Sequence, residues 1–361
     1  MSDVSSRAHT TTLTRRRDGR RAVKQSPVAL RSAVLLQLQR KTVKYQLATV
    51  ATEYQNVFMD SYNIVGVLGR GAFGVVELVR DFNLKKLAVM KTIHIKSMST
   101  ENVKEAIKEI QILQMLNHPN IIKYYNSFQN KQSFHIIMEY AIHGTLENFV
   151  NKCSQTSNYI AQNCVLNIFS QLTMAVDYIH KMRIIHSDIN PMNILLTGSQ
   201  GTIVKLGDFG SSRILTSDKI VGENWCTPCY MSPEQCCGKP LRLKSDIWQI
   251  GCVLYYLITS KHPFYAESLA DTISSIVEGV LSLSDKMTFY DSDVIRLLHE
   301  LLNRDPTVRP NASAILSNPY ILPYVLNSNC RWFKSGDLAA PDHQLPLART
   351  PTSEHCLLVQ K

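Results

Sequence analysis

The residues best suited to chemistry lie in two short stretches near the middle of the chain. The first, HSDINPMN, places Asp188 and Asn193 five residues apart, and the second, DFG, places Asp208 fifteen residues further on. Carboxylate and amide oxygens are ligands that magnesium accepts, and a positioned carboxylate can also take a proton from a hydroxyl. This pattern is typical of phosphoryl transfer, with Asp188 receiving the proton while Asn193 and Asp208 hold magnesium.

A glycine-rich stretch, GRGAFG at residues 69–74, could bind the phosphates. Its G-x-G-x-x-G spacing alone is weak evidence, because dinucleotide-binding folds use the same spacing where a strand leads into a helix. Here the β-branched sequence VVELV follows, which predicts a second strand and therefore a hairpin. Without Cβ atoms the turn can approach phosphates closely, so a lid over ATP is expected.

A lysine and a glutamate form the next candidate pair. Lys91 ends the predicted strand KLAVMKTIHI, and Glu109 follows 18 residues later in the apolar helical stretch AIKEIQIL. A carboxylate among isoleucines needs an opposing cation to offset its desolvation. Lys91 could meet that carboxylate while it binds the α- and β-phosphates. Glu105, one helical turn earlier, is the competing partner.

The elements that must position these residues fall into two halves. Residues 62–81 predict two strands around the glycine turn, and KLAVMKTIHI and SFHIIMEYA predict two more. A helix is expected after Ser99 or Thr100, either of which could cap it. Beyond Gly144 the apolar spacing is helical over residues 162–182, 245–260, 266–279 and 291–303. The sequence therefore predicts an α+β fold, with a small strand-rich half followed by a larger helical half.

Further motifs bring out a family resemblance. CTPCYMSPE (226–234), SDIWQIG with Asp246 and Trp248, and DPTVRP, whose Arg309 would pair with Glu234, follow in order. With the earlier motifs, they make residues 62 to about 320 resemble the eukaryotic protein kinase domain, in its serine/threonine branch. LGRGAFGVVELVRD, LNHPNIIKYYNSF and IIMEYA resemble NIMA-related kinases. The implied fold is bilobal: an N-lobe (62–140) of antiparallel sheet with one main helix, and a mostly helical C-lobe (141–320).

The resemblance implies a complete set of site residues. It selects Glu109 over Glu105, makes Met138 the gatekeeper, and makes Glu139 to Ala141 the hinge that hydrogen-bonds adenine. The catalytic residues it implies are Asp188, Lys91, Glu109, Asn190 and Thr227, and its magnesium ligands are Asn193 and Asp208. The implied ATP contacts are Leu68, Gly69, Arg70, Gly71, Ala72, Phe73, Gly74, Val76, Val89, Lys91, Met138, Glu139, Ala141 and Leu195.

Three positions depart from the family pattern. Ser187 replaces an Arg that usually clamps an activation-loop phosphate, and a Ser cannot make that bidentate contact. Asn190 replaces a Lys that touches the transferred phosphoryl group, which would cost about 1–3 kcal/mol, or roughly 10- to 100-fold in rate. Cys226 replaces a Gly before Thr227, whose hydroxyl could orient Asp188. We expect a slowed but competent enzyme; the alternative is a catalytically weak pseudokinase that acts as a nucleotide-binding scaffold.

The net charge of +10 is concentrated near the start of the chain. Residues 1–60 hold eleven Lys or Arg and four Asp or Glu, whereas the other 301 residues hold 28 and 25. A nearly neutral body argues against nucleic-acid binding by the main domain. Residues 1–58 are expected to be a mostly disordered basic tail, in which Ser26 and Pro27 could begin an amphipathic helix. That helix could dock on the domain or bind a partner such as a cytoskeletal protein, or the tail could be a transit peptide.

The remaining composition points to an ordinary reducing compartment. Nine cysteines in a chain without a secretory h-region favour the cytoplasm, with cytoskeletal or nuclear association as further options. Cys226, Cys229, Cys236 and Cys237 include one C-x-x-C, but the adjacent second pair is poor zinc-chelating geometry. The apolar run IGCVLYYLI is too short to span a bilayer. Residues 325–361 are polar and Pro-rich and are expected to form an unstructured tail.

Overall fold

The computed structural model describes residues 61–334, apart from residues 72–73, 84, 97, 131, 157–158, 216–225, 279–280 and 282–283. The predicted basic tail at residues 1–58 and the last part of the predicted C-terminal tail, residues 335–361, lie outside the described residues. So do Ala72 and Phe73 of the glycine-rich turn.

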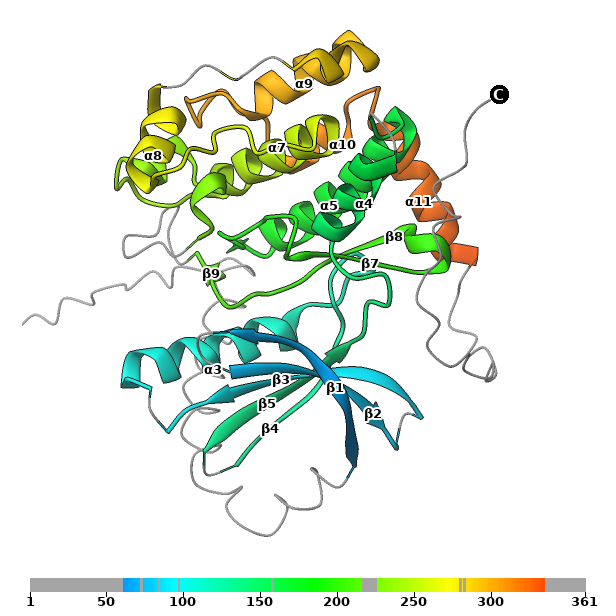
Figure 1. Cartoon of the computed structure of the whole chain (residues 1–361), viewed down its shortest axis with the longest axis vertical. Coiled ribbons are helices and arrows are strands. Elements are labelled where there is room, and N and C mark those ends of the chain that lie inside the picture. The colour runs from blue at the N-terminus through cyan, green and yellow to red at the C-terminus, as the bar shows by residue number, and fades with distance from the viewer. Residues whose placement is uncertain are drawn as a thin grey trace, which may run out of the picture. The chain divides into compact units, whose positions relative to one another are not determined.

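The N-lobe is a five-stranded antiparallel sheet with the strand order β1-β2-β3-β5-β4. Helix α3 lies on the side of the sheet that faces the helical lobe (Figure 1). Ser99 caps this helix, because its side chain accepts a hydrogen bond from the Asn102 N–H. The elements are β1 (Tyr62–Gly71), β2 (Gly74–Asp81), β3 (Lys86–His94), α3 (Thr100–Met115), β4 (Tyr124–Gln129) and β5 (Ser133–Glu139).

Alternation along β3 decides which way Lys91 points. Ala88 and Met90 join a small buried cluster on one face of the sheet. Ile93, two residues after Lys91, packs into the main core together with Ala106 of α3. Because side chains two residues apart in a strand share a face, Lys91 is directed toward α3.

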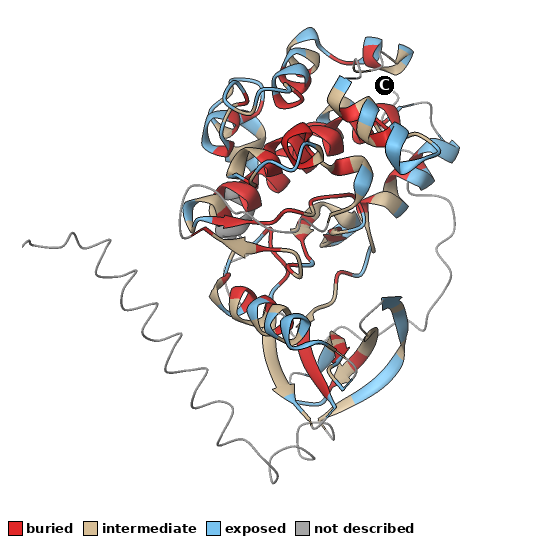
Figure 2. Cartoon of the chain, turned by 90° about the vertical axis from the view of Figure 1, so that its left-hand side faces the viewer, coloured by how far each residue is buried: buried red, intermediate tan, exposed pale blue. Residues whose placement is uncertain are grey.

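The C-lobe is mostly helical and is built around α5 and α7. Every residue from Ser245 to Thr259 of α7 is buried, and Figure 2 shows buried residues concentrated in the central helices of this lobe. At Gly251 an added Cβ would come within 2.9 Å of Leu301 Cβ, so this glycine lets α9 approach α7 closely. The helices are α4 (Leu146–Thr156), α5 (Gln162–Lys181), α6 (Pro233–Cys236), α7 (Leu243–Thr259), α8 (Leu269–Glu278), α9 (Ser292–Leu301), α10 (Ala312–Leu316) and α11 (Leu322–Lys334).

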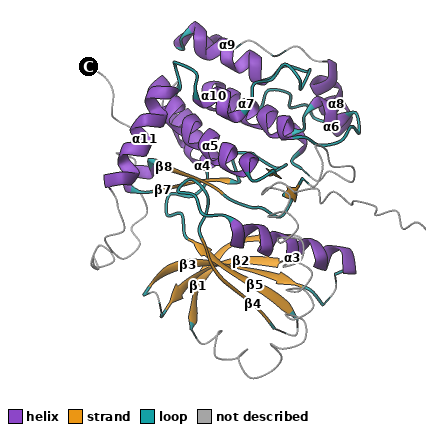
Figure 3. Cartoon of the chain, turned by 180° about the vertical axis from the view of Figure 1, so that it is seen from behind, coloured by secondary structure: helices purple, strands orange, loops and turns teal. Residues whose placement is uncertain are grey.

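Two short β-ribbons carry the loops that hold the chemically interesting residues, and the one formed by β7 and β8 is labelled in Figure 3. One pairs β6 (Ile184–Ile185) with β9 (Arg213–Ile214), and the other pairs β7 (Ile194–Thr197) with β8 (Ile203–Leu206). The loop 186–193 runs from β6 to β7, and the DFG stretch begins two residues after β8. The lobe also contains short 3-10 helices η1 (Ser199–Gly201), η2 (Pro228–Tyr230) and η3 (Asp285–Phe289).

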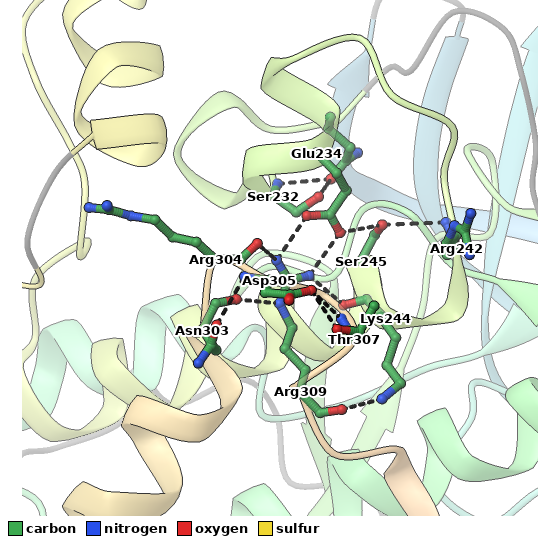
Figure 4. A network of polar contacts seen from close by, with 11 residues as sticks. Ser232, Glu234, Arg242, Lys244, Ser245, Asn303, Arg304, Asp305, Thr307 and Arg309 are labelled. Atoms are coloured by element: carbon green, nitrogen blue, oxygen red, sulfur yellow. Dashed lines mark hydrogen bonds and ion pairs between the residues drawn. The ribbon is translucent and has the colours of Figure 1, made fainter.

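A buried ion pair ties helix α6, and with it the end of the predicted activation segment (residues 208–234), to the rest of the C-lobe. Arg309 Nη1 and Nη2 donate to the two oxygens of Glu234, each at 2.8 Å, and Ser245 Oγ donates to the same carboxylate at 2.9 Å (Figure 4). The guanidinium also lies over the Trp248 ring, 5.0 Å from its centroid. The predicted pairing of Arg309 with Glu234 therefore forms, in a bidentate geometry that suits a desolvated pair.

The predicted α+β bilobal fold is confirmed, with one correction near the C-terminus. The expectation of an unstructured tail from residue 325 is wrong for residues 325–334, because α11 spans Leu322–Lys334. Tyr324 and Val325 pack against the main core, and Tyr324 Oη donates to Asn163 on α5 at 2.6 Å. This docking stabilises a helix that the sequence periodicity did not reveal.

None of the helices among the described residues is both long and apolar enough to cross a membrane.

Candidate active site

Lys91 joins a carboxylate from each lobe. Its Nζ donates to Glu109 Oε1 at 2.7 Å and to Asp208 Oδ1 at 3.0 Å. The Glu109 side chain is only 6% exposed, whereas that of Asp208 is 50% exposed. Glu105, the competing partner, instead pairs with Lys108 at 2.7 Å and with Arg213 at 3.0 Å. The β3 lysine, the α3 glutamate and the DFG aspartate therefore form one cluster.

Burial and charge act in opposite directions within this cluster. Burial lowers the pKa of Lys91, but the neighbouring Glu109 and Asp208 carboxylates outweigh it, so the pKa lies above its usual value. Burial likewise raises the pKa of Asp208, and the Lys91 ammonium reverses this, leaving the pKa below its usual value. Burial raises the pKa of Glu109 in spite of its lysine partner. At neutral pH Lys91 is thus a cation and Asp208 an anion.

A second cluster surrounds Asp188 in the loop between β6 and β7. Oδ1 of Asp188 accepts hydrogen bonds from the N–H and the hydroxyl of Thr227, both at 2.9 Å. Oδ2 accepts from Asn193 Nδ2 at 2.9 Å, and the same Nδ2 also donates to the Asp188 carbonyl at 2.8 Å. A carboxylate oxygen can accept more than one hydrogen bond, so Oδ2 keeps capacity for an incoming hydroxyl.

Asn190 takes a different position from the one expected. Its Nδ2 donates to Asp188 Oδ1 and to Thr227 Oγ1, each at 3.1 Å. Its Oδ1 accepts from the N–H groups of Met192 at 2.9 Å and Asn193 at 3.3 Å. The amide hydrogens are therefore engaged within the loop, because Asp188 and Thr227 lie nearby. A contact from Asn190 to a transferred phosphoryl group would require these bonds to break.

The donors next to the Lys91 cluster fit a hard divalent cation. Asp208 is half-exposed, carries a lowered pKa, and uses Oδ1 for the bonds to Lys91 and to the Gly210 N–H at 3.4 Å. Asn193 uses its Nδ2 on Asp188, which leaves its amide oxygen as the atom able to ligate a metal. Gly207 N–H donates to the Asn193 carbonyl at 2.8 Å and joins the two clusters. An ionised carboxylate and an amide oxygen suit magnesium.

The glycine-rich turn has room for a ligand at two glycines and close packing at the third. A Cβ added to Gly69 or Gly71 would meet no atom of the described residues within 4 Å. A Cβ at Gly74 would lie 1.7 Å from the Thr92 carbonyl oxygen, so this residue must be glycine for β2 to pair with β3. Leu68 and Arg70 at the turn are exposed. The open space at Gly69 and Gly71 fits phosphates approaching the backbone.

The predicted adenine contacts come from both lobes. Val76 and Val89 lie on the N-lobe sheet, where Val89 pairs in register with Met138, and Leu195 lies on β7. All four of these side chains are only half-buried, so apolar surface remains for a ring to cover. At the start of the hinge, Glu139 pairs with Lys205 at 2.8 Å, so its carboxylate anchors the hinge to β8. Ala141 is buried and its carbonyl accepts from Gly144 N–H at 3.2 Å.

The substituted Ser187 is integrated into the loop. It is buried and has a left-handed backbone with φ of +64°. Its hydroxyl donates to the Ser211 carbonyl at 2.7 Å, directly linking the loop to the activation segment. Nearby, Arg213 of β9 makes the ion pair with Glu105 of α3 noted above. These contacts bring the first part of the activation segment onto both lobes, in a place where the sequence offered no signal for a specific partner.

Cys226 replaces the usual glycine without disturbing Thr227. Its Sγ accepts a hydrogen bond from Gln235 Nε2 at 3.6 Å. Burial, with a further contribution from the Asp188 carboxylate, raises the pKa of the thiol to about 12. Cys226 is therefore a neutral thiol at physiological pH and a poor nucleophile.

Comparison with known proteins agrees with this geometry. The family model for the protein kinase domain matches residues 62–321. Serine/threonine-protein kinase Nek8 of Danio rerio is 38% identical over 270 residues, which cover 74% of this chain and 38% of that protein. Serine/threonine-protein kinase nekl-2 of Caenorhabditis elegans is 35% identical over 280 residues, which cover 75% of this chain and 77% of that protein. Serine/threonine-protein kinase Nek5 of Homo sapiens is 33% identical over 264 residues, which cover 73% of this chain and 37% of that protein. The chain thus spans well under half the length of the first and third of these proteins.

Proposed function

The chain belongs to the protein kinase family, in its NIMA-related serine/threonine branch, and from this premise we propose that it is a catalytically active kinase dependent on ATP and magnesium. One observation carries the proposal: Lys91 bonds Glu109 and Asp208 at once, while Asp188, Asn193 and the intervening loop stay hydrogen-bonded nearby. Phosphoryl transfer depends mainly on positioning and electrostatic stabilisation, and these are the groups that supply both.

In the proposed reaction Asp188 prepares the acceptor. A Ser or Thr hydroxyl of a protein substrate donates its proton to Oδ2 of Asp188, the carboxylate oxygen with spare capacity. The hydroxyl oxygen then bonds to the γ-phosphorus of ATP while the bond from that phosphorus to the β,γ-bridging oxygen breaks, giving a phosphoprotein and ADP. Thr227, through its two bonds to Oδ1, keeps the carboxylate turned toward the acceptor.

Lys91 and the metal ligands act on the nucleotide in this proposal. Lys91 would hold the α- and β-phosphates, and Glu109 keeps its ammonium in place against the sheet. Asp208 and Asn193 would hold magnesium, which supplies positive charge to the phosphate oxygens when bound. The open glycines 69 and 71 would admit the phosphates beneath the turn.

A second candidate is a nucleotide-binding scaffold with little transfer activity. The geometry of Asn190 favours it, since a neutral amide lies on Asp188 where a cation would stabilise developing charge. The nucleotide contacts are the same in both candidates, so binding alone does not distinguish them.

The assay that distinguishes them measures transfer itself. Wild type and Asp188→Asn are incubated with γ-labelled ATP and casein, in magnesium or in EDTA, and the phosphoamino acids are identified. The proposal expects phosphoserine and phosphothreonine from wild type in magnesium, and almost none in EDTA or from Asp188→Asn. Equal incorporation by wild type and Asp188→Asn, or none by either, would leave the scaffold as the better description.

The basic segment 1–58 suggests a place for the domain in the cell. Its charge would suit an acidic polymer such as tubulin, so we propose that it tethers the kinase to the cytoskeleton. Nine cysteines suit a reducing compartment, and we propose the cytoplasm or nucleus. Unchanged localisation of a variant that lacks residues 1–58 would contradict the tether.

A further inference from the structure

The backbone on either side of Asp188 is bonded by two side chains of α7. Asp246 accepts hydrogen bonds from the N–H groups of His186 at 3.0 Å and Ser187 at 2.9 Å. One turn further along the helix, Gln249 Oε1 accepts from the Ile189 N–H at 2.9 Å, and its Nε2 donates to the Ser187 carbonyl at 2.8 Å. Gln249 therefore bonds the residue before Asp188 and the residue after it.

We propose that Gln249 is a positioning residue that fixes the direction of the Asp188 side chain for phosphoryl transfer. The inference rests on the proposed function. An amide suits this task because its NH₂ group donates and its oxygen accepts, whereas an ionised carboxylate can only accept. Gln249 is fully buried, and it stands on the most buried helix of the C-lobe. Its two hydrogen bonds are therefore shielded from water and anchor the loop to a rigid helix.

The backbone conformation of Ser187 gives the hydrogen bonds of Gln249 a specific role. A non-glycine residue with φ of +64° is held in a sparsely populated region only when its surroundings determine it. Three contacts do so here: the N–H to Asp246, the hydroxyl to the Ser211 carbonyl, and the carbonyl from Gln249. Removing the Gln249 amide would release the carbonyl of Ser187 and the N–H of Ile189 together. The peptide groups flanking Asp188 would keep the bond of its N–H to His186 Nδ1 at 3.3 Å and the bonds of its carbonyl to Asn193 at 2.8 Å and Asn190 at 3.3 Å, but would be held less tightly.

The effect should be confined to chemistry. Gln249 contacts neither Lys91 nor Asp208, so nucleotide binding should persist when it is replaced. Thr227 and Asn193 would still bond the Asp188 carboxylate, so the group would be displaced rather than lost. Misplacing a catalytic group by a fraction of an ångström to an ångström reduces rate by roughly 10- to 100-fold.

Gln171 provides a matched control for a purely structural role. It is also a buried glutamine of a C-lobe helix, and it accepts from Asn120 Nδ2 at 3.0 Å and from the Val204 N–H at 3.1 Å. Its Nε2 donates to the Thr202 carbonyl at 2.9 Å. No bond reaches it from residues 186–189 among those that the structure describes. Its loss should cost stability without moving Asp188.

The experiment compares Gln249→Met, Gln249→Glu and Gln171→Met with wild type. For each protein we would measure kcat, KM for ATP, the urea unfolding midpoint, and hydrogen exchange of the Ile189 amide. Gln249→Met should lower kcat about 10- to 100-fold with KM for ATP within about threefold, and should speed exchange at Ile189. Gln249→Glu keeps the acceptor and loses the donor, so its kcat should lie between that of wild type and that of Gln249→Met. Gln171→Met should lower the midpoint and leave kcat within about threefold.

Several results would overturn the proposal. One is unchanged kcat together with unchanged Ile189 exchange in Gln249→Met; another is an equal kcat loss in Gln171→Met, which would mean that rate follows stability. If Gln249→Met does not fold, an unchanged kcat in Gln249→Glu also overturns it. A wild type that transfers no phosphate would defeat the proposed function. Hydrogen exchange of the Ile189 amide would then be the test of whether Gln249 holds the backbone around Asp188. Protection of the Ile189 amide that is lost in Gln249→Met supports the proposal, and protection that persists in Gln249→Met overturns it.

Discussion

Glu109→Gln should reduce kcat/KM for ATP by about 10- to 150-fold. The substitution keeps the shape of the side chain and removes the charge that faces Lys91 across 2.7 Å. A hydrogen bond between charged groups contributes about 1.5–3 kcal/mol, and the Glu109 side chain is well shielded at 6% exposed. Since each 1.36 kcal/mol corresponds to a tenfold change in rate, the loss converts to the stated range. The Gln amide oxygen could still accept from Lys91, but Asp208 would be the one charged partner left to it among the described residues, so Lys91 would be held less firmly.

Glu105→Gln is the matched control, because it removes a carboxylate from the same helix one turn away. Glu105 is 35% exposed, far more than Glu109, and pairs with the exposed Lys108 and the half-buried Arg213, so its loss should cost about 1 kcal/mol, or about fivefold. Both variants are assayed with casein at varied ATP, and thermal unfolding checks that each is folded. The reasoning is refuted if Glu105→Gln loses as much kcat/KM as Glu109→Gln, or if Glu109→Gln retains wild-type kcat/KM.

Three further predictions address rate, stability and pH. Asn190→Lys places a cation beside Asp188 and should raise kcat on casein about tenfold; a lowered kcat would mean that the hydrogen bonds of the amide matter more than charge. Arg309→Met leaves its buried carboxylate partner unpaired and should lower the unfolding free energy in urea by about 3–5 kcal/mol, against less than about 1 kcal/mol for the exposed Arg296→Met; equal losses would contradict this. The side-chain amide of Asn130 forms a hydrogen bond with Nε2 of His135, and burial lowers the pKa of His135 to about 4. Because the pKa is near 6.5 in the unfolded state, protonation of His135 favours unfolding. Its contribution should therefore be fully present above about pH 6.5 and fall by about 2 kcal/mol by about pH 5; urea unfolding of wild type and His135→Gln at about pH 7.5 and about pH 5 measures it, and identical pH dependence of the two would contradict the assignment.

Local patterning predicted the larger elements well. The expected helix at residues 162–182 is Gln162–Lys181 in the structure, and the one at 245–260 is Leu243–Thr259. Both bury most of their residues, so apolar spacing over several turns carried a strong signal. The hairpin at 62–81 was equally legible, because glycines interrupt two β-branched runs. The choice of Glu109 over Glu105 agrees with the geometry at Lys91, although it came from the family resemblance and not from the local sequence.

Contacts between segments far apart in the chain could not be predicted from local sequence patterns. Helix α11 depends on docking against α5, and its Leu322 and Leu326 are exposed, so its apolar spacing gave little signal. The hydrogen bonds of Asn190 to Thr227, and of Gln249 to the loop around Asp188, join residues 37 to 62 positions apart. Which way an amide points depends on the donors and acceptors that folding brings beside it. Residue types alone could suggest chemistry at these positions, but not partners.

The central claim is that Lys91 and Asp208 serve nucleotide binding while Asp188 serves transfer. It is tested most directly by measuring MgATP affinity calorimetrically and phosphate transfer to casein in a single turnover, for wild type and Asp188→Asn. We predict that Asp188→Asn binds MgATP within about threefold of wild type and transfers phosphate at least about 100-fold more slowly. Transfer by Asp188→Asn at the wild-type rate would contradict the account.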